Sequence, residues 1–326
     1  MKKMFKYTLL LIFFHSFIFS DGPYNVNIIT EQDGLRNGPY YSGGIVYYPV
    51  DVDGPLPVLV LVPGFVSSIS SIEDWGPYLA SYGIVTMFVN VNNIFQDPYY
   101  RSSALLDGLI SINEENSRYN SPLFNNLNIY NSAVGGWSMG GGGAQIAAQQ
   151  NQDINAVIAM SPWLPNSNIT LNNETPILFL SGQYDSVAPN YLHTDVFYSN
   201  TPISTDKLLF EISGGNHQTV CSPYNNISMG LKTVYFIEKY IADNSINCDD
   251  LISVPLFSSD FLTNIVCESN ILGDLNEDNF LNVQDIILLI DLILLNSYSE
   301  LGDLNYDNYL NVQDVIMLTS LILNDN

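Results

Sequence analysis

A serine stands between two glycines in the sequence Gly136-Trp137-Ser138-Met139-Gly140. This G-x-S-x-G spacing is typical of a nucleophile elbow, a sharp strand-to-helix turn that exposes the serine hydroxyl for attack on an acyl group. The glycines are needed because larger side chains two residues from the serine would clash in so tight a turn. A glycine-rich turn without chemistry is the alternative. Residues 132–137 have the pattern of a buried strand and residues 140–150 that of a helix, so the context favours a nucleophilic Ser138.

A serine nucleophile needs a base, and the chain contains three histidines, His15, His193 and His217. His15 lies in an N-terminal segment that we expect to be removed. His193 is on an expected helix, eight residues after Asp185, too soon for the strand that should separate the acid from the base. We therefore expect His217 to be the base and His193 to be a neighbour that lines the cleft.

The acid should come between the serine and the histidine, because hydrolases of this type have the chain order Ser, acid, His. Asp185 follows the apolar run 177–181, and His217 follows the apolar run 208–212. Both residues therefore stand at the carboxyl ends of expected strands, where such sites assemble. The predicted triad is Ser138, Asp185 and His217. Other acids nearby are expected to be solvated surface carboxylates: Asp153, Asp195 and Asp206.

The same topology predicts the groups that stabilise a tetrahedral oxyanion. One donor should be the backbone N–H of the residue after the nucleophile, Met139, and the other should come from a loop after an early strand. The loop at residues 61–65 fits this description and nominates the Phe65 N–H. The rings of Phe65 and Trp163 could flank a bound acyl group, although packing in the core is the commoner explanation for either aromatic alone.

Short apolar runs alternate with amphipathic stretches between residues 44 and 243, which predicts an α/β domain with a mostly parallel sheet and helices on both faces. Only 47 residues separate Ser138 from Asp185, which leaves no room for a lid domain and predicts an open, shallow cleft. The expected strands are residues 58–62, 84–90, 132–137, 156–160, 177–181 and 208–212. The expected helices are residues 72–82, 103–113, 140–150, 191–198 and 228–242.

The N-terminus and the charge balance indicate where the protein acts. Lys2, Lys3 and Lys6 precede an apolar run at residues 7–18, and Ser20 offers a small residue for cleavage, so residues 1–20 are expected to be a secretory signal peptide. No other segment approaches a transmembrane length. The 326 residues include 9 Lys and Arg against 33 Asp and Glu, a formal charge of −24. This disfavours nucleic acid and anionic membranes as partners, because phosphate binding needs clustered cations.

Several motifs together resemble the bacterial cutinases and poly(ethylene terephthalate) (PET) hydrolases, over about residues 44–267. They are VPGF at 62–65, WGPYLASYGIV at 75–85, RSS at 101–103, GWSMGGGG at 136–143, SPW at 161–163, DSVAP at 185–189 and GGNH at 214–217. The resemblance implies an α/β-hydrolase fold, the triad and oxyanion donors given above, and substrate contacts at Trp137, Trp163 and Val187. We count Phe65 and Met139 among the substrate-binding residues as well.

The resemblance also bears on the cysteines and on the walls of the cleft. Three cysteines allow at most one internal disulfide, and Cys248 and Cys267, the preferred pair, match the C-terminal disulfide of the family. His193 and Phe197 are similar to the bulkier pair that restricts the Trp163 position in ordinary cutinases, and we count both among the substrate-binding residues. Gly182 stands where one subgroup has the first cysteine of a second disulfide.

The last 58 residues contain a near-exact repeat, GDLNEDNFLNVQD at 273–285 and GDLNYDNYLNVQD at 302–314, each followed by an apolar helical run. Hard oxygen ligands recur at positions 1, 3, 5, 7, 9 and 12 of a twelve-residue loop, a spacing that suits Ca²⁺. An acidic linker is the alternative, and it leaves the double match unexplained. The predicted ligands are Asp274, Asn276, Asp278, the Phe280 carbonyl, Asn282 and Asp285, and then Asp303, Asn305, Asp307, the Tyr309 carbonyl, Asn311 and Asp314.

One loop followed by one helix, twice, resembles a type I dockerin, which implies two bound Ca²⁺ ions and a cohesin-like partner. A Ca²⁺-stabilised tail that anchors or sorts the protein at the cell surface is equally consistent with the repeat.

These observations predict a signal peptide at residues 1–20, a catalytic domain at 21–268 and a dockerin-like all-α calcium module at 269–326. The predicted activity is that of a secreted serine ester hydrolase that cleaves polyesters and short-chain esters and needs no catalytic cofactor. Two alternatives stay open. One is a carboxylesterase or lipase for small soluble esters or acylglycerols, and the other is a dockerin-borne adaptor whose hydrolase domain is inactive.

Overall fold

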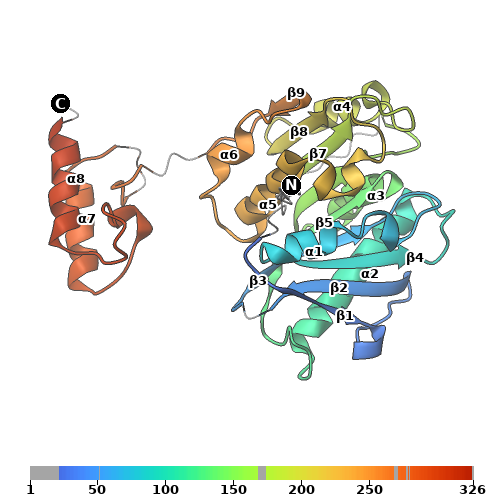
Figure 1. Cartoon of the computed structure of the whole chain (residues 1–326), viewed down its shortest axis with the longest axis horizontal. Coiled ribbons are helices and arrows are strands. Elements are labelled where there is room, and N and C mark those ends of the chain that lie inside the picture. Colours follow the sequence, from blue (N-terminus) through green and yellow to red (C-terminus); the bar gives the residue numbers. More distant parts are fainter. Residues whose placement is uncertain are drawn as a thin grey trace, which may run out of the picture. The chain divides into compact units, whose positions relative to one another are not determined.

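The computed structural model describes residues 22–50, 52–167, 174–267, 271–276, 278 and 280–324. They form two compact units, which divide between Ile265 and Val266 (Figure 1). The predicted signal peptide and the predicted boundary between residues 268 and 269 lie outside the described residues. Among the described residues, no helix is long and apolar enough to cross a membrane.

The larger unit is built on one nine-stranded sheet with the strand order β1-β2-β4-β3-β5-β6-β7-β8-β9. The six strands from β4 to β8 in this order are parallel, whereas β1, β2 and β9 are antiparallel to their neighbours. The strands are β1 Val26–Thr30, β2 Tyr41–Pro49, β3 Leu56–Val62, β4 Val85–Val91, β5 Leu127–Trp137, β6 Ile154–Met160, β7 Ile177–Gly182, β8 Lys207–Ile212 and β9 Ser258–Thr263.

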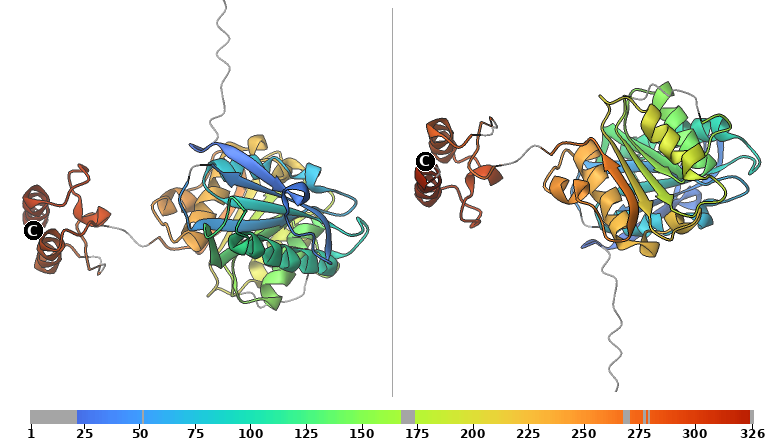
Figure 2. Two further views of the ribbon diagram at one scale, coloured as in Figure 1. Left: turned by 90° about the horizontal axis from the view of Figure 1, so that it is seen from below. Right: turned by 90° about the horizontal axis from the view of Figure 1, so that it is seen from above.

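Helices cover both faces of this sheet, as Figure 2 shows, and the predicted α/β architecture is confirmed. Helices α2, α3 and α4 pack on one face, and α1 and α5 pack on the other, where Tyr78 of α1 lies against Gly230 of α5. The helices of this unit are α1 Trp75–Ser81, α2 Pro98–Ser117, α3 Met139–Gln150, α4 Thr194–Asn200, α5 Ile227–Ile241 and α6 Cys248–Ile252.

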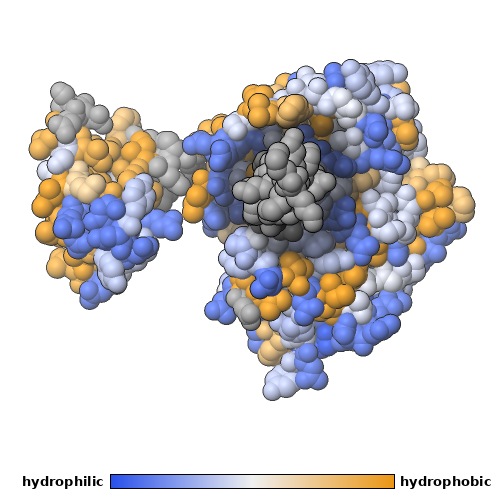
Figure 3. Space-filling model, viewed as in Figure 1, coloured by the Kyte–Doolittle hydropathy of each residue, from blue (hydrophilic) through white to orange (hydrophobic). Residues whose placement is uncertain are grey.

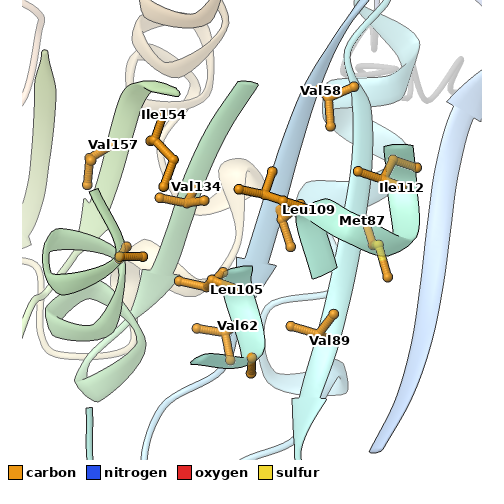
Figure 4. Packing of buried hydrophobic residues seen from close by; sticks show 14 of the residues in the cluster. Val58, Val62, Met87, Val89, Leu105, Leu109, Ile112, Val134, Ile154 and Val157 are labelled. Atoms are coloured by element: carbon orange, nitrogen blue, oxygen red, sulfur yellow. The ribbon is translucent and has the colours of Figure 1, made fainter. Parts of the chain in front are cut away.

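The core forms where aliphatic side chains of the parallel strands meet α2 and α3. All seven residues of β3 are buried, as expected for a central parallel strand that is covered on both faces. Figure 4 shows Val62 and Val89 from the strands facing Leu105 and Leu109 of α2. This packing fixes the carboxyl ends of the strands, where the loops that carry the candidate site begin.

The six predicted strands are present, but the three outer strands were not predicted. No residue of β9 (SSDFLT) is buried, so this segment lacks the apolar run of a buried strand, and in β2 two adjacent glycines interrupt the strand pattern before the apolar residues 45–48. The predicted helix at residues 191–198 is wrong in one respect. A 3₁₀ turn at Asn190–Leu192 precedes α4, and His193 lies between the two elements with φ −129° and ψ −83°. The His193 N–H donates hydrogen bonds to the carbonyls of Pro189 and Asn190, which closes the turn before α4 begins.

The smaller unit contains α7 Val283–Leu294 and α8 Val312–Asn324, which pack around Leu289, Leu304 and Leu318. Each helix begins three residues earlier than the apolar runs suggest. In the first repeat the Asn282 side chain caps α7 by accepting a hydrogen bond from the Gln284 N–H.

The cysteines behave as expected. Cys248 and Cys267 are disulfide-bonded, and Cys221 is the free cysteine. Burial raises the pKa of the Cys221 thiol to about 12, so Cys221 is a neutral thiol at physiological pH and not a nucleophile.

Candidate active site

Ser138 lies on the turn between β5 and α3, in a backbone conformation that few side chains adopt. Its φ is +57° and its ψ is −119°, the strained geometry that a nucleophile elbow requires. The flanking glycines are explained by contact with the end of β3. A Cβ atom on Gly136 would lie 2.6 Å from the Val62 carbonyl oxygen, and one on Gly140 would lie 2.3 Å from the same oxygen. Only glycine fits at either position.

His217 and Asp185 form a buried pair in the loops after β8 and β7. The His217 Nδ1 atom lies 2.7 Å from Asp185 Oδ2. The other carboxylate oxygen of Asp185 accepts hydrogen bonds from the N–H groups of Val187 and Ala188, at 2.9 and 2.8 Å. Three donors therefore hold the carboxylate in place, and the carboxylate in turn orients the imidazole.

Trp137 connects the serine turn to the histidine loop. Its indole Nε1 donates a 2.9 Å hydrogen bond to the His217 carbonyl, and its ring centroid lies 5.1 Å from that of His217. The described residues include no hydrogen bond between the Ser138 hydroxyl and His217; such bonds are often long without substrate. Trp137 is 8% exposed, as is His217, and its indole N–H holds the His217 loop; its contact with substrate stays a prediction.

The N–H groups of the predicted oxyanion donors have no partner in the part of the chain that the structure describes. Among the described residues, neither the Phe65 N–H nor the Met139 N–H donates a hydrogen bond, and Met139 is the first residue of α3, where N–H groups lack helical partners. The loop that carries Phe65 lies against the nucleophile, since a Cβ on Gly64 would be 3.0 Å from Ser138 Cβ. Two unpaired N–H groups therefore flank Ser138.

The remaining predicted substrate-binding residues differ in exposure. Val187 and Phe65 are exposed, and Trp163 is half-buried and tied to the elbow by its N–H, which donates to the Ser138 carbonyl at 2.9 Å. Phe197 is buried in the core and lies behind His193, with 6.0 Å between the ring centroids. His193 lies between Phe197 and Trp163, 5.9 Å from the Trp163 ring. Phe197 therefore contacts His193, which in turn contacts Trp163.

Two of the acids that were expected to be solvated are not. Asp206 accepts a 2.7 Å hydrogen bond from the Tyr240 hydroxyl. Burial raises the pKa of Asp195, and the negative charges of Glu211 and Asp260 raise it further. Both residues are half-buried, and the local sequence does not reveal this because their burial depends on the packing of distant segments. Asp153 is exposed, as expected.

His193 should make the fold sensitive to acid. Burial lowers its pKa, and the nearby His217 adds to this effect while Asp185 opposes it. Since the pKa is lower in the folded state than in the unfolded state, the unfolded chain binds a proton first, and stability falls as the pH drops through this range. We expect the melting temperature of His193→Gln to fall less between pH 7 and pH 5 than that of the natural chain. Equal losses in a thermal melt would contradict this prediction.

Exposed aromatic and aliphatic side chains surround the candidate site. Phe65 and Phe95 form an edge-to-face pair with ring centroids 5.9 Å apart, and Tyr184 and Tyr191 are exposed in the loops after β7. Figure 3 shows hydrophobic residues gathered at the right-hand edge of the larger unit, over the cyan and teal loops of Figure 1. An apolar rim of this kind suits a hydrophobic substrate.

The two acidic loops of the smaller unit have matching hydrogen bonds. In each loop the aspartate at position 12 accepts from loop N–H groups, for example the Leu275 N–H to Asp285 at 2.9 Å and the Leu304 N–H to Asp314 at 3.0 Å. Among the described residues, no three Asp, Glu, His or Cys side chains gather in an arrangement that could hold a metal ion. The predicted ligand set is broader, since half of it consists of Asn side chains and backbone carbonyls.

A mostly parallel sheet with helices on both faces, a serine elbow and a histidine–aspartate pair at neighbouring strand ends define an α/β-hydrolase. The PETase family model, described as PET hydrolase-like, matches residues 16–255, and the chain belongs to this family. It is a carboxylic ester hydrolase.

Three curated relatives have similar sequences. Lipase 1 of Moraxella sp. (strain TA144) is 28% identical, over 69% of this chain and 68% of its own length. Cutinase est2 of Thermobifida alba is 29% identical, over 69% of this chain and 72% of its own. The bis(hydroxyethyl) terephthalate hydrolase of Streptomyces coelicolor is 29% identical, over 69% of both chains.

Proposed function

We propose that this ester hydrolase cleaves polyesters, of the cutin or PET type, by a Ser-His-Asp acyl-enzyme mechanism. The observation that carries the proposal is the strained Ser138 elbow beside the buried His217–Asp185 pair. In this mechanism His217 takes the proton of Ser138 as the hydroxyl attacks the ester carbonyl, and Asp185 stabilises the resulting imidazolium. The Phe65 and Met139 N–H groups bind the oxyanion, the alcohol leaves with the proton from His217, and water then releases the acid.

The polymer substrate is favoured by the surroundings of the site. In the part of the segment between Ser138 and Asp185 that the structure describes, the elements are α3, β6 and β7, with no lid helix among them, so a polymer chain could lie across the nucleophile. The apolar rim that includes Phe65, Phe95 and Val187 would contact such a chain. The names of the relatives, which include cutinases and a terephthalate ester hydrolase, support the same substrate class.

The test is release of soluble aromatic acids from an amorphous PET film by the full chain, with a short p-nitrophenyl ester in parallel. We expect products from both substrates. Cleavage of the short ester alone would assign the protein to carboxylesterases for small esters, the second of the functions considered, and would point to His193 as the residue that restricts Trp163. Activity on neither substrate would favour an inactive adaptor.

We further propose that the smaller unit binds two Ca²⁺ ions and attaches the enzyme to a cohesin-like protein or a cell-surface anchor after secretion. Support comes from the two loops with matching ligand types and from the exposed aliphatic residues on both helices, such as Ile287 and Ile316. The ligands would be the six residues of each loop predicted above. The donors are hard oxygens, which fit Ca²⁺ and not a thiophilic metal.

A further inference from the structure

Arg101, in the first turns of α2, is completely buried, and its guanidinium donates only to main-chain carbonyls. The Nε atom donates to the Pro63 carbonyl at 3.0 Å, and one terminal nitrogen donates to the carbonyls of Gly64 at 2.7 Å and Ile94 at 3.3 Å. The other terminal nitrogen donates to the carbonyls of Gln96 and Asp97. Among the described residues, no carboxylate is within salt-bridge distance of Arg101.

These five carbonyls belong to two loops that both border the candidate site. Residues 63–64 follow β3 and lead into Phe65, and residues 94–97 follow β4 and lead into α2. The Val66 N–H also donates to the Ile94 carbonyl at 2.9 Å, so the two loops are joined directly as well as through Arg101. Burial lowers the pKa of Arg101 only to about 10, so the guanidinium is charged at neutral pH. Its hydrogen bonds are therefore charge-assisted and stronger than neutral ones.

The Gly64 carbonyl matters most because it shares a peptide unit with the Phe65 N–H. A trans peptide is planar, with the C=O and N–H pointing in opposite directions. When Arg101 holds the Gly64 oxygen at 2.7 Å, the Phe65 N–H is therefore turned away from Arg101. The same peptide lies against the nucleophile, since a Cβ on Gly64 would be 3.0 Å from Ser138 Cβ. A donor bound at the carbonyl also polarises the peptide and makes its N–H a better donor.

We propose that Arg101 is a positioning residue for ester hydrolysis, which orients and polarises the Gly64–Phe65 peptide so that the Phe65 N–H is held ready for the oxyanion. The inference rests on the proposed function, in which Phe65 is an oxyanion donor. The planar fork of arginine suits the task because it reaches both loops at once, whereas the single ammonium of lysine cannot reproduce five fixed donors. Arg101 is placed by close packing of α2 on α3, where a Cβ on Gly143 would lie 2.8 Å from Arg101 Cβ.

The test compares Arg101→Met and Arg101→Lys with the natural full chain, using a p-nitrophenyl ester and the corresponding thionoester, whose C=S group is a weak hydrogen-bond acceptor. Loss of one oxyanion donor costs about 10²–10³-fold in kcat, so loss of its positioning should lower kcat for the oxoester at least about tenfold in Arg101→Met. We expect KM to change less than about threefold, because the oxyanion contact strengthens in the transition state. Thionoester turnover should fall much less, and Arg101→Lys should give intermediate values.

Lys232 supplies a matched control. It is a second buried cation, on α5, and it donates to the main-chain carbonyls of Asp250 and Ser253 and to the Ser253 hydroxyl, none of which belongs to the loops that Arg101 joins. Lys232→Met should lower the melting temperature and leave kcat for both esters unchanged, which separates a loss of stability from a loss of positioning.

Two results would overturn the proposal. One is a kcat for Arg101→Met within about twofold of the natural value at a temperature where both chains are folded. The other is an equal fall in oxoester and thionoester turnover, which would mean general misalignment. If Arg101→Met does not fold, the oxoester-to-thionoester ratio of Arg101→Lys, which keeps the buried charge, decides the question by the same criterion. Failure of the proposed function is distinguishable. A natural chain without the serine esterase mechanism would cleave neither ester, and one that cleaves the short ester but not PET film would still allow the Arg101 comparison.

Discussion

Ester hydrolysis is expected to fall at least about 10⁴-fold when Ser138 is replaced by alanine, because the Ser138 hydroxyl forms the acyl-enzyme in the proposed mechanism. The fold should not change. Alanine keeps the Cβ atom, so it can adopt the positive φ that serine has at position 138. The Ser138 hydroxyl makes no hydrogen bond to another described residue, so none is lost with it. The residual rate should come from the two N–H groups beside the elbow and from substrate binding.

The measurement is turnover of the p-nitrophenyl ester and of PET film by Ser138→Ala, with a thermal melt to show that the variant is folded. Ser181→Ala is the matched control, because Ser181 is also a buried serine, on β7, whose hydroxyl has no partner among the described residues. Removing a hydroxyl without a partner should cost little stability and no activity. Turnover by Ser138→Ala above about one per cent of the natural rate would show that another residue is the nucleophile.

Much of the larger unit could be predicted because its signals are local. The parallel strands are buried on both faces, so they read as apolar runs, and the elbow needs glycines at fixed positions because Gly136 and Gly140 both abut the Val62 carbonyl. The acid and base were chosen from chain order and strand ends, and the structure places their side chains 2.7 Å apart. Edge strands such as β9 were missed because exposed, polar strands have no apolar run.

Other features of the site could not be predicted because they depend on contacts between distant segments. Arg101 appeared in the sequence only as part of an RSS motif, since its partners are backbone carbonyls, which every residue has and which leave no mark on side-chain spacing. The aromatic residues near the nucleophile gave a similar difficulty. The hydrogen bond from the Trp137 indole to the His217 loop and the burial of Phe197 in the core both depend on tertiary packing, and the contact of either ring with substrate stays a prediction.

We expect a calcium chelator to unfold the smaller unit and leave the hydrolase unit intact, because the proposed Ca²⁺ ions would hold that unit folded. Four of its aspartates, Asp274, Asp285, Asp303 and Asp314, are buried, and residues 269–326 contain no Lys or Arg to balance them. Buried carboxylates without a cation are strongly destabilising, whereas the binding free energy of a metal adds directly to the stability of the folded state. The small core around Leu289, Leu304 and Leu318 cannot offset this cost alone.

The measurement is calorimetry and circular dichroism of the full chain with Ca²⁺ and with a chelator. We expect the chelator to abolish a separate unfolding transition and part of the helical signal, while p-nitrophenyl ester turnover stays the same. Titration should give two Ca²⁺ ions per chain, and Asp285→Ala should reduce this to one, because it removes the position-12 ligand of one loop only. Asp291→Ala, at an exposed aspartate of α7 outside the loop, is the matched control and should still bind two. Identical spectra with and without chelator would mean that the loops fold through their own hydrogen bonds, such as those from the Leu275 and Leu304 N–H groups, without an ion.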